Sequence, residues 1–71
     1  MSEYTIIFED AGSNYVAYVP DLPGCVGAAD TVEELRELMR EAIELHIEGL
    51  RREGVEVPPP STKAGTVIVT P

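Results

Sequence analysis

The segment from Tyr15 to Cys25 constrains the fold of this chain more than any other part of it. Its first half, Tyr-Val-Ala-Tyr-Val, is rich in aromatic and β-branched residues, which favours a strand. Its second half contains Pro20, Pro23 and Gly24. Proline cannot donate a backbone hydrogen bond or continue a central strand, and glycine can adopt a left-handed conformation. The segment therefore predicts a strand, a rigid corner and then another strand.

Other segments also have the composition of strands. Residues 4–9 alternate apolar side chains and are rich in aromatic and β-branched types. Residues 10–14 have the composition of a turn, so we expect a β-hairpin between residues 4–9 and 15–19. Residues 25–29 read as a short third strand. Residues 66–70, Thr-Val-Ile-Val-Thr, have among the highest strand propensities in the chain and predict the last strand.

One long helix separates the third strand from the last. Thr31 and Glu34 fit a capping box, in which each residue satisfies a backbone N–H of the other. The apolar pattern continues to about Glu53, and Gly54 is a suitable residue to end the helix. Gly49 inside the helix costs about 1 kcal/mol against alanine, and it marks either a close approach or early fraying. The apolar stripe comprises Leu35, Leu38, Met39, Ala42, Ile43, Ile47 and Leu50.

The predicted order is β-β-β-α-β in one domain spanning residues 1–71. The proline run of residues 58–60 is a stiff spacer before the last strand. A long helix between strands three and four implies a right-handed crossover that places residues 66–70 parallel to residues 4–9. We therefore expect an α+β fold with one mixed four-stranded sheet and a helix on one face. This arrangement is half of an RNase H-like sheet.

The corner motif, followed by Asp30, Thr31 and a glutamate-rich helix, resembles the signature of the HicB-like antitoxins of bacterial toxin-antitoxin pairs. The resemblance covers nearly the whole chain. It implies a partial RNase H-like fold and a small basic mRNA-cleaving toxin of the double-stranded-RNA-binding fold as partner, whose active histidine the antitoxin blocks. No helix-turn-helix or ribbon-helix-helix segment follows the last strand, so autoregulatory DNA binding is not expected. The structural signature comprises Tyr18, Pro20, Asp21, Leu22, Pro23, Gly24 and Cys25.

Charge also favours a basic protein partner. Thirteen acidic residues against five basic ones give a formal net charge of −8, which opposes direct contact with nucleic acid. Four glutamates fall within an arc of about 60° on the helix, opposite the apolar stripe, with Arg40 and Arg51 expected to offset part of their charge. This surface is either a partner-binding ridge or a solvated face that keeps the protein soluble. The acidic ridge comprises Glu37, Glu41, Glu44 and Glu48.

Self-association is the expected source of additional stability. A chain of 71 residues buries only about 60% of its unfolded surface. It has one cysteine and one histidine, too few for an internal disulfide or a structural zinc site. Apolar residues occur on both sides of the predicted sheet, and one helix covers only one side. We therefore expect a homo-oligomer, either a dimer or a tetramer.

The enzymatic alternative is a metal-dependent RNase H-like nuclease, which needs several carboxylates around two metal ions. Asp10 is the candidate, but the last strand carries no acid, so we expect Asp10 to be a turn residue. Cys25 lacks an associated base and is expected to be a packing residue. His46 is expected at the edge of the core, and Asp21 is expected to accept N–H groups within the corner. We therefore predict no catalytic residue, metal or cofactor.

The chain has no run of about 18 apolar residues and begins without the basic and apolar regions of a secretion signal. We therefore expect a cytoplasmic protein with no membrane partner. The sequence as a whole predicts a non-catalytic antitoxin-like protein. The alternative outside enzymes is an orphan oligomeric module that binds some other protein.

Overall fold

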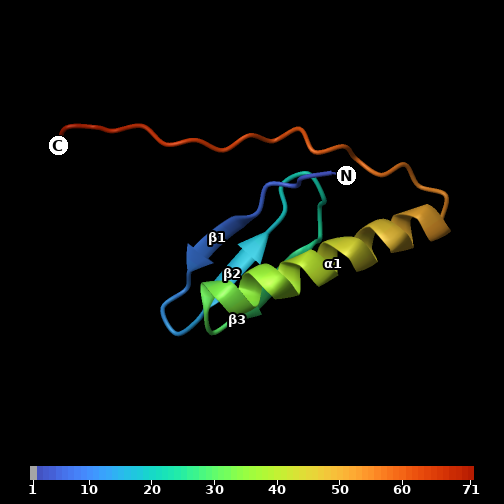
Figure 1. The fold of residues 1–71 in the computed structure, drawn as a ribbon, viewed down its shortest axis with the longest axis horizontal. Coiled ribbons are helices and arrows are strands. Elements are labelled where there is room, and N and C mark those ends of the chain that lie inside the picture. The colour runs from blue at the N-terminus through green and yellow to red at the C-terminus, as the bar shows by residue number, and fades with distance from the viewer. Residues whose placement is uncertain (1) are drawn as a thin grey trace.

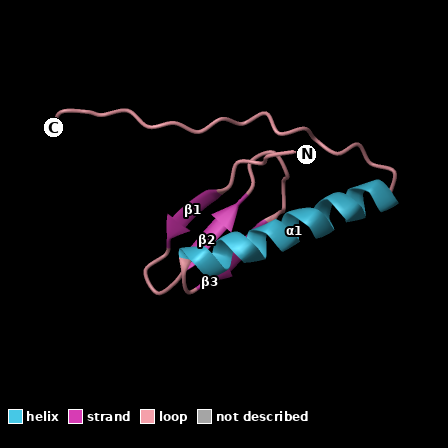
Figure 2. Cartoon of the chain, in the orientation of Figure 1, coloured by secondary structure: helices cyan, strands magenta, loops and turns pink. Residues whose placement is uncertain are grey.

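The computed structural model describes residues 2–71, which form an α+β fold. Three strands, β1 (Ile7–Asp10), β2 (Tyr15–Tyr18) and β3 (Val26–Ala29), precede one helix, α1 (Val32–Arg52). The strands form an antiparallel sheet of order β1-β2-β3. The helix lies across one face of this sheet, and the segment after it runs back past the N-terminal residues (Figures 1 and 2). The α+β class and the helix on one face are confirmed.

The predicted hairpin forms around a tight turn. The N–H of Ala11 donates to the carbonyl of Asn14 at 2.8 Å. The carboxylate of Asp10 accepts from the N–H of Gly12 at 2.9 Å, and Gly12 has a φ of 95°. Asp10 is therefore the last residue of β1, and its side chain stabilises the turn that follows. Residues 4–6, expected to belong to the first strand, lie before β1, and Tyr4 and Ile6 pack against the core.

Both ends of α1 are capped by the residues that the sequence indicated. The hydroxyl of Thr31 accepts from the N–H of Glu34 at 3.1 Å, which is the first half of the predicted capping box. Gly54 has a φ of 74°, and the N–H of Val55 donates to the carbonyl of Leu50 at 2.9 Å, as in a Schellman motif. Within residues 2–71, no helix has the length and apolar character needed to cross a membrane.

The core lies between α1, β2 and β3. Leu22, Leu35 and Met39 are completely buried. Gly27 in β3 allows the helix to approach the sheet, because a Cβ at this position would lie 2.9 Å from the sulfur of Met39. The helix continues through Gly49, where a Cβ would meet no heavy atom within 4 Å. The close approach therefore occurs at Gly27 and not at Gly49.

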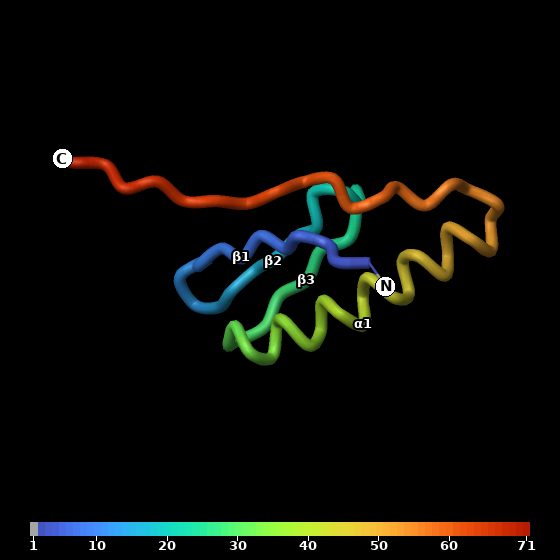
Figure 3. The backbone as a smooth tube through the Cα atoms, turned by 45° about the horizontal axis from the view of Figure 1, so that its top comes forward, coloured from blue at the N-terminus to red at the C-terminus, as the bar shows by residue number. Residues whose placement is uncertain are grey.

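The fourth strand predicted for residues 66–70 is wrong for the single chain. This segment forms no strand, and Val67, Ile68 and Val69 are 86%, 101% and 77% exposed. The chain runs past the N-terminal residues and then diverges from β1 (Figures 1 and 3). Its backbone therefore has no neighbouring strand within residues 2–71 to pair with. The sheet has three strands in place of four, and the crossover to a parallel fourth strand of RNase H-like type is not made.

Candidate partner-binding surface

The predicted corner is a compact loop held by its own backbone. The N–H of Val19 donates to the carbonyl of Cys25, and the N–H of Cys25 donates to the carbonyl of Leu22, at 3.1 and 3.0 Å. Gly24 has a φ of 89°, which a residue with a side chain rarely adopts. Leu22 projects into the core and is completely buried. The corner thus combines a rigid backbone with an apolar anchor.

The remaining residues of the structural signature lie at the surface of this corner. Tyr18 ends β2 and is 40% exposed. Pro20 is partly buried and Pro23 is exposed. Tyr18, Pro20 and Pro23 therefore lie along the corner and do not form a polar site.

Asp21 has a different role from the one predicted. It was expected to accept N–H groups within the corner, but its carboxylate binds Ser61 and Thr62, about 40 residues later. The two backbone N–H groups donate at 2.9 Å each, and the two hydroxyls donate at 3.2 Å from Ser61 and 2.7 Å from Thr62. These bonds, first those from Thr62, lower the pKa of Asp21 to about 2. We call this set of residues the Asp21 clamp.

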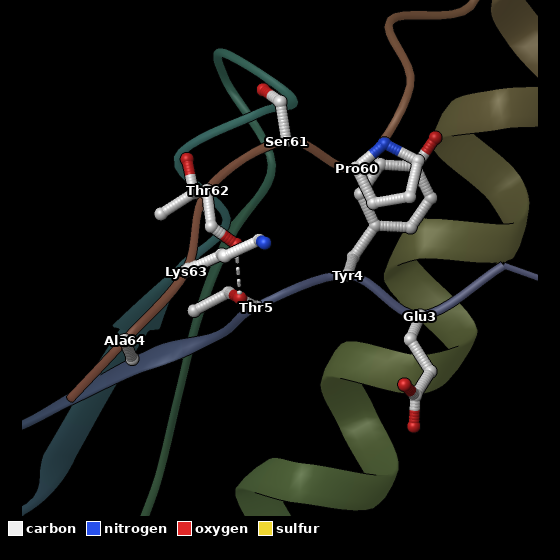
Figure 4. Close-up of a pocket in the computed structure, with 8 residues that line it drawn as sticks. All are labelled: Glu3, Tyr4, Thr5, Pro60, Ser61, Thr62, Lys63 and Ala64. Carbon is white, nitrogen blue, oxygen red and sulfur yellow. Dashed lines mark hydrogen bonds between the residues drawn. The ribbon is translucent and has the colours of Figure 1, made fainter.

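Two further hydrogen bonds fix the same segment to the N-terminal residues. The hydroxyl of Tyr4 donates to the carbonyl of Pro58 at 2.7 Å, and the hydroxyl of Thr5 donates to the carbonyl of Thr62 at 2.8 Å. Figure 4 shows the two chain segments side by side, with the bond from Thr5 as a dashed line. An open surface pocket of about 660 Å³ is lined by residues of both segments. Local sequence patterns could not reveal these contacts, because their partners lie more than 50 residues apart.

The acidic ridge lies on an exposed face of α1, and an arginine orders part of it. Arg40 donates a hydrogen bond to Glu37, and its guanidinium lies 3.8 Å from the carboxylate of Glu44. The hydrogen bond between Arg40 and Glu37 lowers the pKa of Glu37 and raises the pKa of Arg40. The side chains of Glu37 and Glu44 are 64% and 67% exposed. Their carboxylates are therefore positioned by Arg40 and still accessible to a partner.

The second arginine on the ridge is not the predicted one. Arg52 pairs with Glu48 at 2.6 Å, whereas Arg51 was expected to offset the ridge charge. The i, i+4 spacing of Glu48 and Arg52 is the signal that would have identified this pair. In the part of the chain that the structure describes, no ion pair involves Glu41. Four carboxylates and two paired arginines leave the acidic ridge with a net charge of about −2.

The other candidate residues do not form a catalytic cluster. Cys25 is buried, and burial raises the pKa of its thiol, as suits a packing residue. His46 is partly buried, and its Cε1 would lie 4.0 Å from a Cβ built on Gly24. The helix therefore passes close to the corner at this point. Among residues 2–71, no group of three or more His, Cys, Asp or Glu side chains is placed to hold a metal ion.

Comparison with known proteins supports the family indicated by the corner motif. The sequence model of the family described as "HicB_like antitoxin of bacterial toxin-antitoxin system" matches residues 4–69. The fold is similar to a chain of the solved "HicA3 and HicB3 toxin-antitoxin complex", with a TM-score of 0.72 and 33% sequence identity. That match covers 83% of this chain and 70% of the other.

Similar sequences come from a phage and from archaea. A protein of Haemophilus phage HP1, described as an uncharacterized 14.9 kDa protein in the rep-hol intergenic region, is 44% identical over 55 residues. A UPF0150 protein of Archaeoglobus fulgidus is 46% identical over 43 residues, and one of Thermoplasma acidophilum is 35% identical over 66 residues. The matches cover 78%, 61% and 92% of this chain. They cover 41%, 62% and 96% of the respective relatives, so this chain spans less than two thirds of the first two.

Proposed function

The chain belongs to the HicB-like antitoxin family, and we propose that it binds and neutralises a small basic mRNA-interferase toxin in a type II toxin-antitoxin pair. The solved structure that it resembles is itself a toxin-antitoxin complex, which supports a toxin as the partner. The proposed mode of action is direct binding, so that the toxin's surface is covered for as long as the complex lasts.

The observation that carries this proposal is the accessible acidic ridge. Its carboxylates are exposed, and Arg40 holds Glu37 and Glu44 in place. A row of positioned acceptors with net negative charge suits a basic partner, since complementary charge accelerates encounter and fixes orientation. The formal net charge of −8 adds a longer-range attraction toward a positively charged partner.

The proposed action is not catalytic. The carboxylate of Asp10, the candidate for a nuclease site, accepts a hydrogen bond from the N–H of Gly12 within the hairpin turn. Cys25 is buried, and its raised thiol pKa keeps the reactive thiolate scarce at neutral pH. Both side chains have a structural use, which supports a protein that acts by binding.

An RNA-cleavage assay with a purified toxin tests the proposal. The toxin for this assay would be a small basic protein encoded directly beside the gene for this chain. We expect cleavage to fall with each addition of the wild-type chain and to stop near equal amounts, because each toxin surface is then covered. A toxin that continues to cleave RNA in the presence of excess folded chain would overturn the proposal.

A matched pair of variants locates the binding surface. One variant changes the four ridge glutamates to glutamine. Its control changes four other exposed acids to glutamine, so both carry the same net charge. We expect the ridge variant to need a higher concentration to stop cleavage than the control. Equal potency would keep the antitoxin role but move its surface away from the ridge. The control acids are Glu3, Glu9, Glu53 and Glu56.

A further inference from the structure

The segment after the Asp21 clamp has the properties of a strand without a neighbour. We call residues 65–70 the arm. Its centre, Val67, Ile68 and Val69, is β-branched and 77% or more exposed. Such residues favour a paired strand, and an unpaired strand leaves a row of N–H and C=O groups open to another chain. The clamp fixes the point at which the arm leaves the body.

The sheet has an open edge that such a strand can join. β1 lies at the edge of the three-stranded sheet. The hydrogen bond from the N–H of Ala11 to the carbonyl of Asn14 fixes which residue pairs of the hairpin are hydrogen-bonded. Because bonded and non-bonded pairs alternate, the backbone N–H and C=O groups of Phe8 and Asp10 point away from β2. These groups can accept one more strand.

A largely apolar groove lies beside residues 4–6, just before this edge strand, on the helix side of the sheet. It has a volume of about 590 Å³, and its apolar lining is formed by Tyr4, Ile6, Ile43 and Ile47. Its charged lining is formed by Arg36, Glu37, Arg40 and Glu44 of α1. Side chains of a strand alternate between the two faces of a sheet. A strand that pairs with β1 and extends toward residues 4–6 would therefore direct every second side chain toward this groove, and the arm offers valine and isoleucine for those positions.

The opposite face of the sheet is also apolar. Ile7, Tyr18 and Val26 lie opposite one another across the three strands. Tyr18 is 40% exposed and Val26 is 65% exposed, because α1 covers only the other face. The remaining side chains of an added strand would extend this row. The arm is apolar on both of its sides, as a strand in this position needs to be.

We propose that the arm of one copy pairs as a fourth strand with the β1 edge of a second copy, which returns its own arm in the same way. A second copy is the occupant because the chain itself carries both the arm and the matching edge and groove. In the single chain, the arm leaves the body in a direction that diverges from β1 (Figure 3). Two reciprocal contacts close under two-fold symmetry. The exchange would supply the strand that the sequence predicts and the single chain lacks.

Sedimentation equilibrium and amide hydrogen exchange on the full chain, without any toxin, test this proposal. We expect a mass of twice the 7.7 kDa chain mass at micromolar concentration. Every second amide of residues 66–70, and those of Phe8 and Asp10, should exchange slowly in the dimer because they are bonded across the new strand pair. Dilution should release the dimer and speed exchange at both sites together.

Two substitutions of exposed residues provide the comparison. Ile68→Lys should give a folded chain of single mass with fast exchange in the arm, because a charge replaces a side chain that the new sheet buries. Leu45→Lys is the control, since Leu45 on α1 is 69% exposed and lies outside the proposed contact. It should leave the mass unchanged. Far-UV circular dichroism checks that both variants are folded.

Several results would overturn the proposal. A single-chain mass with slow exchange in residues 66–70 would show that the arm closes onto its own body. A dimer whose arm exchanges fast, or that Leu45→Lys dissociates, would place the contact elsewhere. Protection of the arm only after addition of the basic toxin would assign the arm to that partner. The measurement on the chain alone does not depend on the proposed toxin binding.

Discussion

Asp21 and Thr62 lie 41 residues apart in the sequence and are joined by two hydrogen bonds, from the N–H of Thr62 at 2.9 Å and from its hydroxyl at 2.7 Å. Both bonds have a carboxylate as acceptor, and such bonds are shorter and stronger than those between neutral groups. The segment after α1 is therefore fastened to the corner, and not to a strand. This attachment leads to the first prediction.

Asp21→Asn should loosen the segment after α1 without unfolding the body. An amide has one oxygen to accept bonds, and its NH₂ group faces N–H donors that it cannot bind. We expect trypsin to cleave after Lys63 several-fold faster in this variant than in the wild-type chain, measured by mass spectrometry of the released peptide. Asp30→Asn, at another exposed aspartate, is the control. Equal cleavage of all three proteins would show that the clamp does not restrain the chain.

The clamp should also respond to acid. The pKa of Asp21 is lowered from its ordinary value of 3.8 to about 2. A lowered pKa means that the attachment is fully present above pH 3.8 and is lost as the pH falls toward 2. We expect the amide NMR signals of Ser61 and Thr62 to shift within this window. The same transition in Asp21→Asn would trace it to a different carboxylate.

Two glycines should respond in opposite ways to alanine. Gly27→Ala should destabilise the protein by about 1 kcal/mol, because the new Cβ would meet the buried sulfur of Met39 at 2.9 Å. Gly49→Ala should stabilise it by about 0.5–1 kcal/mol, because its Cβ meets no atom within 4 Å and alanine favours the helix. Urea denaturation at one fixed protein concentration measures both. A loss of stability in Gly49→Ala would contradict the open space found there.

Cys25 should behave as a packing residue. Cys25→Ala should lower the free energy of unfolding by about 1 kcal/mol and leave partner binding unchanged. In the folded wild-type chain, burial raises the pKa of the thiol, so a disulfide reagent should label it slowly at neutral pH. Urea should restore rapid labelling. Weakened binding by a well-folded Cys25→Ala variant would reveal a role in recognition.

The acidic ridge should control the rate of association with a basic partner. Changing its four glutamates to glutamine should slow association by about tenfold at low salt and flatten its salt dependence, because surface charge mainly steers encounter. Stopped-flow measurements over a range of salt concentrations test this. The four-residue control variant, which changes the net charge from −8 by the same four units, should lose less. Identical rates for the two variants would point to total charge as the cause.

Metal-dependent cleavage of RNA is not expected. With Mg²⁺ or Mn²⁺, the purified chain should degrade neither RNA nor an RNA–DNA hybrid above background, because the Asp10 carboxylate is used within the hairpin turn. Gel electrophoresis of a labelled substrate measures this. Cleavage that disappears in Asp10→Asn would falsify the non-catalytic assignment, whereas cleavage that persists in that variant would indicate a contaminating nuclease.

The features that the sequence predicted well are those whose physics is local. The hairpin turn uses the positive φ of Gly12. The helix begins after Thr31, whose hydroxyl accepts from the N–H of Glu34. It ends before Gly54, whose positive φ lets the next N–H bond to a carbonyl of the last turn. The apolar alternation of residues 4–9 is also found in the fold, where Tyr4, Ile6 and Phe8 pack against the core. In each case the relevant partners lie within a few residues or follow a simple period.

The features that it missed depend on distant partners. Strand propensity identifies residues 66–70 as suited to a sheet, but it carries no information on which edge, or which chain, supplies the neighbour. Similarly, the position of Asp21 between two strand-breaking residues suggested a local role, and only the fold brings Ser61 and Thr62 to it. The exposed character of the acidic ridge could be read from helical spacing, whereas its binding role is a proposal that the kinetic experiment addresses.

The position of α1 within the chain sets an order of events during folding. Within residues 2–71, the strand pairs and the helix–sheet contacts are made by residues up to Arg52, and hairpins and helices form within about 10 μs. The meeting of two copies is bimolecular and takes milliseconds to minutes, depending on concentration. The body can therefore collapse before the arm meets another copy. An arm would then meet neighbours whose β1 edges are already formed.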